Sequence, residues 1–240
     1  KNLIEQPLAN GLKFGDITIN KISQRTIRKY LDDKTAKVSA NRHIAFLKVI
    51  FNWGLERYSI IKINPCIGVR LYSEKARERY IEDWEYELVR DLASVEYIPI
   101  FMEIAYLCRA RWSEIASLRR DCISDDGLYL TRSKGSKDEI TLWTPRLRLA
   151  VDNALQFNDS RFSHYLIHNP SGEPIQQSAF TSAWRRVMDN ALKNGLADRF
   201  TFHDIKAKGV SDHESKHSGH KTESMKHVYD RKINKVISTK

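Results

Sequence analysis

The stretch FTFHDIKAKGVSDHESKHSGHKTESMKHVYDRK (residues 200–232) crowds histidines and lysines around one tyrosine, Tyr229. A metal site, a phosphate-binding site with a tyrosine nucleophile and a solvated basic tail all fit this composition. The choice among them bears on what chemistry the chain performs. The rest of the sequence provides the observations for that choice.

A metal site is the weakest of these interpretations. Four histidines have spacings that bring ligands together on a helix, namely His213, His217, His220 and His227. However, Gly219 lies within the run, no cysteine is near and lysines are frequent. Structural zinc sites prefer cysteine together with histidine, and lysines beside a divalent cation are unfavourable. We therefore predict no metal here.

The composition favours a globular protein that binds a polyanion. The chain has 240 residues, is 41% hydrophobic and carries a formal net charge of +10, a balance most often found in proteins that bind nucleic acid. No apolar run approaches the roughly eighteen residues that a membrane span needs. Three scattered cysteines are typical of buried thiols in a reducing compartment. Because the sequence begins at Lys1 without a signal segment, we expect a fragment of a longer protein.

The first part of the chain reads as a small helical unit. Ser23 is a plausible N-cap for a helix that buries Ile27, Tyr30 and Leu31. A longer helix over residues 40–58 has apolar residues at three- and four-residue steps. That stripe is Ala40, Ile44, Leu47, Phe51, Leu55 and Tyr58. Pro65 breaks that helix because it disfavours helical geometry at Asn64, and the charged stretch 70–81 lacks hydrophobic periodicity and is predicted to be a linker.

The second part predicts a larger unit that is mostly helical. Helical periodicity marks residues 82–93, 99–118, 145–157 and 177–195, the last ended by Gly195, and a helix, loop and helix follow from His203. Leu128 and Leu130 are expected opposite Ile140 and Leu142 in a β-hairpin whose turn contains Gly135, and residues 164–168 suit a short strand. The predicted fold class is α+β: mainly α with a small antiparallel β-sheet.

Several polar residues of this unit suit phosphate chemistry. His203 and Lys206 lie one helical turn apart, and Tyr229 follows His220 by nine positions. A tyrosine with a pKa of about 10 needs neighbouring cations or a base to act as a nucleophile. Arg111 stands at a helix start with Glu114 three residues later, where a guanidinium could receive a phosphate. A surface tyrosine and an exposed ion pair remain open as alternatives.

These segments together resemble the tyrosine recombinase family, in particular phage-type integrases. The matching stretches are CRARWSEI, SKGSKDE, HDIK, SGH and VYDRK, in the family's order. Before them, TIRKYLDDK, ANRHIAFLKVIFNWGLERY and INPCIGV resemble the helices and exit of the family's core-binding domain. The resemblance implies an N-terminally truncated core-binding domain over 1–69, a linker over 70–81 and a catalytic domain over 82–240.

The resemblance assigns a role to each of six residues. It implies that Arg111 and His203 bind the scissile phosphate, that Lys134 is the general acid and that Tyr229 is the nucleophile. His220 would bind the phosphate and assist proton transfer, and Lys206 stands where the family has a second arginine. In the core-binding domain we expect Arg42, His43 and Lys48 to contact DNA.

Two positions depart from the family pattern. The usual Thr-Gly before the first arginine is Cys108-Arg109, which replaces a glycine's backbone freedom with a second arginine. Lys206 keeps the positive charge of the family's second arginine but cannot make its bidentate fork. We expect this chain to work with lysine, and Lys208 to face elsewhere on the helix.

The resemblance implies a site-specific recombinase that integrates or excises a phage or mobile element, with no cofactor and no metal. Its partners would be double-stranded attachment-site DNA, a tetramer of itself on that DNA, a host DNA-bending protein and an excision factor, in the cytoplasm near the nucleoid. Three alternatives stay open: a DNA-binding protein of this fold that has lost cleavage, a type IB topoisomerase and a metal-dependent nuclease.

Overall fold

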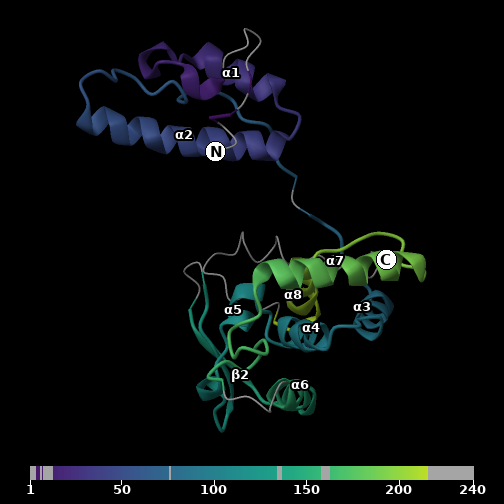
Figure 1. Ribbon diagram of the computed structural model, residues 1–240. Coiled ribbons are helices and arrows are strands. Elements are labelled where there is room, and N and C mark those ends of the chain that lie inside the picture. Colours follow the sequence, from purple (N-terminus) through teal and green to yellow (C-terminus); the bar gives the residue numbers. More distant parts are fainter. Residues whose placement is uncertain are drawn as a thin grey trace, which may run out of the picture. The chain divides into compact units, whose positions relative to one another are not determined.

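The structure is a computed structural model of the 240-residue chain, and it describes residues 4–5, 7, 13–75, 77–133, 137–157 and 163–215. The chain divides into two compact units, Lys1–Ala76 and Arg77–Lys240 (Figure 1). Each unit has its own hydrophobic core. The division falls inside the stretch 70–81 that lacks hydrophobic periodicity.

The first unit is built on two helices, α1 (Gln24–Asp33) and α2 (Lys37–Arg57), after short 3-10 turns at Phe14–Asp16 and Ile19–Lys21. The predicted N-cap is confirmed, because the Thr26 N–H donates to Ser23 Oγ at 3.2 Å. The core gathers residues from both helices and their flanking segments, namely Phe14, Ile27, Tyr30, Leu31, Ala40, Ile44, Leu47, Phe51 and Cys66.

The predicted apolar stripe of α2 is confirmed over most of its length and wrong at its end. Leu55 is half-buried, while Tyr58 is exposed because it follows the last helical residue, Arg57, and its ring lies against Trp53 instead (centroids 5.5 Å apart). The opposite face of α2 is also partly apolar, with Phe46 and Val49 exposed.

The second unit packs around α4 (Tyr97–Leu107), whose side chains Phe101, Met102, Ile104 and Ala105 have no exposed surface. Pro99 is tolerated because it lies in the first turn of α4. Around α4 lie α3 (Asp83–Asp91), α5 (Trp112–Ala116), α6 (Pro145–Gln156), α7 (Gln177–Lys193) and α8 (Phe202–Asp212) (Figure 1).

The helix ends follow the capping residues. Pro145 begins α6 as predicted, with the Leu147 N–H donating to Thr144 Oγ1 at 3.2 Å. After α7, Gly195 adopts a φ of 101°, a left-handed conformation that glycine adopts without strain. At Gly209 in α8 an added Cβ would lie 2.2 Å from the carbonyl oxygen of Tyr106. Glycine is therefore required for the close approach of α8 to α4.

The predicted hairpin is present, formed by strands β1 (Gly127–Leu130) and β2 (Glu139–Leu142). Its register differs from the expectation by one residue: Leu128 pairs with Thr141, and Leu130 pairs with Glu139. Paired residues project to the same face, so the buried leucines of β1 lie on the core side while Ile140 and Leu142 are exposed. The fold is mainly α with a small antiparallel sheet.

Residues 164–168 do not form the expected strand. They contribute only isolated bridges, from Tyr165 to Arg119 and from His168 to Pro174. The segment is therefore paired with the chain after α5 and with the turn before α7 by single bridges, not by a ladder. In the part of the chain that the structure describes, no helix is long and apolar enough to cross a membrane.

The stretch 70–81 is attached at both ends. Asn41 Nδ2 donates to the carbonyl of Tyr72 at 2.9 Å, and Arg42 pairs with Glu74 at 2.9 Å, both within the first unit. Arg77 pairs with Asp204 of α8 at 3.2 Å, within the second unit. Each end of this stretch therefore contacts the unit beside it.

Candidate active site

Arg111 stands at the N-cap of α5 and is held by Glu114, one turn later. The Arg111 backbone N–H donates to Glu114 Oε2 at 2.8 Å, and its guanidinium Nη1 donates to Oε1 at 2.6 Å. The Arg111 side chain is 11% exposed and that of Glu114 is 1% exposed. The expected orientation of Arg111 by Glu114 is therefore present, but as a buried pair rather than an exposed one.

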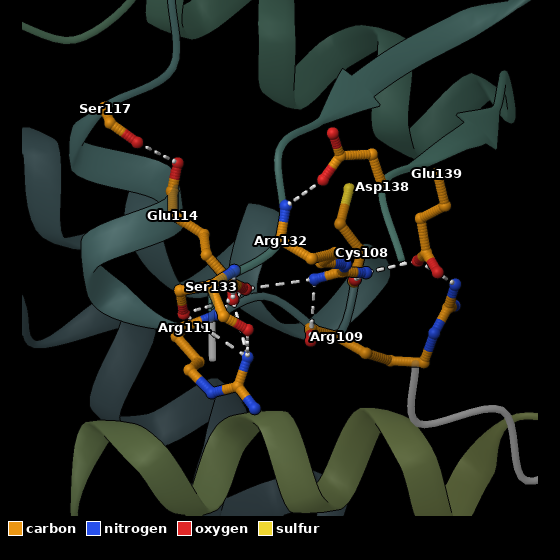
Figure 2. A network of polar contacts seen from close by, with 9 residues as sticks. All are labelled: Cys108, Arg109, Arg111, Glu114, Ser117, Arg132, Ser133, Asp138 and Glu139. Carbon is orange, nitrogen blue, oxygen red and sulfur yellow. Dashed lines mark hydrogen bonds and ion pairs between the residues drawn. The ribbon is translucent and has the colours of Figure 1, made fainter. Parts of the chain in front are cut away.

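Glu114 receives more donors than Arg111 alone supplies. Ser133, just after β1, donates to Oε1 through its backbone N–H at 3.0 Å and its hydroxyl at 2.8 Å (Figure 2). Burial opposes ionisation of Glu114, but the hydrogen bonds from Arg111 and Ser133 outweigh it and lower the pKa of Glu114 to about 2. A carboxylate that stays ionised at neutral pH thus fixes Arg111.

Helix α8 presents His203 and Lys206. The helix begins at a reciprocal cap in which the Thr201 N–H and hydroxyl both donate to Asp204 Oδ2 at 2.7 Å. His203, in the first turn, is exposed, whereas Lys206 is buried. The predicted one-turn spacing is therefore real, but the two side chains differ in their access to solvent.

Lys206 lies in an environment that disfavours its charge. Burial, and then the nearby guanidinium groups of Arg111 and Arg132, lower the pKa of Lys206 to about 7, although Glu114 and Glu139 act in the opposite direction. An anion such as a phosphate at this position would restore the ammonium form. Lys206 is thus part of the charged cluster around Arg111.

A groove of about 1000 Å³ opens beside this cluster. Arg111 and His203 line it together, with basic side chains from Arg77 and Arg199 at its edge. Its lining also includes the aromatic rings of Trp112, Phe180, Trp184, Phe200 and Phe202. The groove thus brings two of the predicted phosphate ligands to one surface of the second unit.

Lys208 is two residues from Lys206 but belongs to another cluster. Its ammonium pairs with Asp83 at 2.5 Å and with Asp212 at 3.0 Å, and it donates to Tyr80 Oη at 3.1 Å. Burial lowers its pKa, but the ion pairs outweigh burial and raise it. Lys208 therefore faces different groups from Lys206 and ties α8 to the segment before α3.

The remaining predicted catalytic residues, Lys134, His220 and Tyr229, lie outside the described residues. In the first unit, Arg42 and Lys48 are exposed on α2. His43 is half-buried and its Nδ1 lies against the hydroxyl of Tyr30. Burial lowers the pKa of His43. Of the three residues predicted to contact DNA, Arg42 and Lys48 are therefore more exposed to a ligand than His43.

Sequence reasoning missed Arg132 and Glu139, which complete the buried cluster. Arg132 Nη1 donates to Glu114 Oε2 at 3.1 Å, its Nη2 pairs with Glu139, and Arg109 lies 3.5 Å from Glu139 (Figure 2). The only sign of them in the sequence was a charged residue on each side of the predicted hairpin turn. A charged residue next to a turn is usually exposed, so the sequence alone did not distinguish them.

The described residues offer no cluster of three histidine, cysteine or acidic side chains arranged for a metal ion. All three cysteines are free thiols. Cys66 and Cys108 are buried, as predicted, and Cys122 is half-buried. Burial raises the pKa of Cys108 to about 11.

Several solved structures share this fold. A lambda integrase dimer bound to a COC' core site is 20% identical with a TM-score of 0.75, covering 93% of this chain and 70% of that chain. The Tn1549 transposon integrase in complex with circular intermediate DNA is 13% identical with a TM-score of 0.69, covering 92% and 85%. XerA recombinase is 16% identical with a TM-score of 0.54, covering 92% and 82%.

No curated protein matches this chain. The phage integrase family matches residues 86–213, which is more than half of the sequence and includes Arg111, His203 and Lys206. The family match and the shared fold agree with the order of motifs in the sequence. The chain belongs to the phage integrase family, whose members are tyrosine recombinases.

Proposed function

We propose that the chain is a site-specific DNA recombinase that integrates or excises a phage or other mobile element. One observation carries the proposal: Arg111, fixed by a buried carboxylate, shares a groove with His203 and lies beside Lys206. Two such groups on one surface, with a buried lysine close to them, suit a single phosphate. The family membership gives that phosphate its context, a DNA backbone.

The proposed cleavage needs no high-energy cofactor, because the energy of the broken phosphodiester bond is kept in the phosphotyrosyl bond. The Tyr229 hydroxyl passes its proton to His220 and its oxygen attacks a backbone phosphorus, forming a 3′-phosphotyrosyl bond. The bond from phosphorus to the 5′ oxygen breaks, and Lys134 donates a proton so that a 5′-hydroxyl leaves. A 5′-hydroxyl from a partner strand then attacks the phosphotyrosine, which releases Tyr229 and joins the strands.

Charge on the non-bridging oxygens rises during both steps. We assign its neutralisation to Arg111, His203, Lys206 and His220. Removing one such preorganised donor typically slows a reaction by about 10²–10³-fold. The unusual member is Lys206, since a lysine with a lowered pKa supplies its full charge only when a phosphate is present.

DNA binding would use both units. We propose residues 1–69 as a core-binding domain, with Arg42 and Lys48 on the exposed surface of α2 as phosphate contacts, and residues 82–240 as the catalytic domain. A solved structure of a lambda integrase with this fold contains a tetramer bound to a Holliday junction. We propose the same assembly for this chain on its own attachment sites, in the cytoplasm of a bacterial host.

Covalent trapping tests the proposal. Nicked duplexes that carry attachment-site candidates flanked by randomised bases are incubated with the protein in EDTA and separated on a denaturing gel. The expected result is a shifted protein–DNA band that disappears with Tyr229→Phe and persists with Tyr58→Phe, a matched change of an exposed tyrosine in the first unit. Sequencing of the trapped DNA identifies the site.

The same gel distinguishes the second candidate function, a DNA-binding protein without cleavage. Lys206 in place of arginine is the observation that favours this alternative. A band from Lys206→Arg but none from the parent means that the lysine has weakened the site. Binding without a band from either protein refutes the recombinase. DNA fragments that appear only when EDTA is omitted and a divalent metal is present, without a shifted protein–DNA band, support a metal-dependent nuclease instead.

A further inference from the structure

A buried arginine next to Arg111 has no role in the chemistry proposed above. Arg132 lies two residues after β1, and its side chain is 1% exposed. Its guanidinium donates to the carbonyl of Cys108 at 2.6 Å and to that of Arg109 at 3.2 Å, in addition to its contacts with Glu114 and Glu139. Burying this charge is costly unless each contact is well formed.

The two carbonyls belong to the turn that leads into Arg111. Helix α4 ends at Leu107, and Arg109 adopts a φ of 49°, in the left-handed region that glycine favours. That conformation strains a residue that has a side chain. The carbonyls at a helix end also lack partners within the helix. Arg132 supplies donors to this turn.

Arg132 also reaches Arg111 from the other side, through Glu114. Each oxygen of this carboxylate binds one guanidinium group: Oε1 accepts from Arg111 at 2.6 Å, and Oε2 accepts from Arg132 at 3.1 Å (Figure 2). Arg132 therefore contacts both the backbone that precedes Arg111 and the side chain that orients it.

We propose that Arg132 is a positioning residue that holds Arg111 in its phosphate-binding orientation, through the carbonyls of residues 108 and 109 and through Glu114. The inference rests on the proposed function. It explains how this chain keeps Arg109 in a conformation where a glycine would be relaxed. It also couples the end of β1, and so the hairpin, to the position of Arg111.

The test measures single-turnover cleavage, DNA affinity and thermal unfolding of the full chain for Arg132→Met and Arg132→Lys. A misplacement of about 1 Å at a catalytic group typically costs about 100-fold in rate. We expect about that loss of cleavage rate for Arg132→Met, with DNA affinity within about threefold of the parent. The control Arg119→Met removes an exposed arginine paired with Asp121 at 3.4 Å and should change neither.

Two further measurements separate positioning from general destabilisation. A methylphosphonate at the scissile position removes one non-bridging negative charge, so cleavage depends less on Arg111 and the loss in Arg132→Met should fall below about tenfold. Arg109→Gly relaxes the turn and should recover part of the rate lost in Arg132→Lys. Because Arg132→Lys keeps the buried charge, it serves if Arg132→Met fails to fold.

The outcomes are distinct. A parent that gives no covalent product refutes the proposed function and, with it, this inference. A parent that cleaves while Arg132→Met and Arg132→Lys cleave equally fast refutes the inference alone. An equal loss on phosphate and methylphosphonate, without recovery by Arg109→Gly, assigns Arg132 to stability only and also overturns it.

Discussion

Replacing Lys206 with methionine is expected to stabilise the protein in a pH-dependent way. Lys206 is buried and its pKa is lowered to about 7 by burial and by the nearby Arg111 and Arg132, from an ordinary value of 10.5. Methionine has a similar length, carries no charge and tolerates irregular packing. The variant therefore removes the cost of the buried ammonium without opening a large cavity.

The size of the effect follows from proton binding in the two states. Below pH 7 the folded and unfolded chains both hold the proton at Lys206, so the full cost of the buried charge is present. Between pH 7 and 10.5 only the unfolded chain holds it, and the stability of the parent rises by roughly 1.4 kcal/mol per pH unit. Because Lys206 is half protonated in the folded chain at pH 7, the advantage of Lys206→Met over the parent should shrink by about 2 kcal/mol from pH 7 to about pH 9.

Urea unfolding followed by tryptophan fluorescence measures this difference. Four of the five tryptophans lie in the second unit, and Trp53 is the exception. A Trp53→Phe background makes the signal specific for the unit that contains Lys206. This matters because a chain with two units need not unfold in one step.

Lys208 provides the matched control on the same helix. Its ion pairs raise its pKa, so the stabilisation it contributes is present throughout this range and is lost only as the pH rises through its folded-state value. Lys208→Met should destabilise the second unit by on the order of 3 kcal/mol with little change from pH 7 to about pH 9. A flat difference for Lys206→Met over the same range would refute the reasoning about its environment.

Three other changes test the fold and the site. Gly209→Ala should lower the stability of the second unit by about 1–3 kcal/mol in urea unfolding, because the added Cβ would meet the backbone of Tyr106. Gly54→Ala should cost less stability, because only the end of the Ile61 side chain must move. Equal losses of stability would contradict this account. Glu114→Gln should slow cleavage by about 10²-fold. In acid unfolding, the parent should lose the stabilisation from ionised Glu114 as the pH falls from about 4.5 to about 2. An acid transition that is the same in the variant and the parent would argue against this role of Glu114. Removing the Arg42 charge with Arg42→Gln should reduce the slope of log affinity against log salt by about 0.9, measured by fluorescence anisotropy, and an unchanged slope would exclude a phosphate contact.

Local sequence patterns were enough to predict the fold class and the family. Local signals were sufficient for the helices, because Ser23, Pro145 and Gly195 act through their own backbone geometry and through neighbours a few residues away. The alternation of Leu128 and Leu130 was sufficient for a hairpin. Motif order then identified the family, since each motif is short and contiguous.

The arrangement of the charged residues of the site could not be predicted from the sequence and became clear only in the folded chain. The hairpin register differed by one residue from the expectation, and the register determines which strand residues face the core. The burial of Arg132 and its contact with Glu114 depend on the meeting of segments 18 residues apart. Charge type and spacing do not predict such a contact.

Lys206 shows the same limit most clearly. Its sequence position indicated a phosphate ligand, and Lys208, two residues later, has the same chemical type. Tertiary packing places Lys206 beside two guanidinium groups and Lys208 between two carboxylates, so burial shifts one pKa down while ion pairs shift the other up. The charge of a buried lysine depends on its neighbours in space, and only the folded chain determines them.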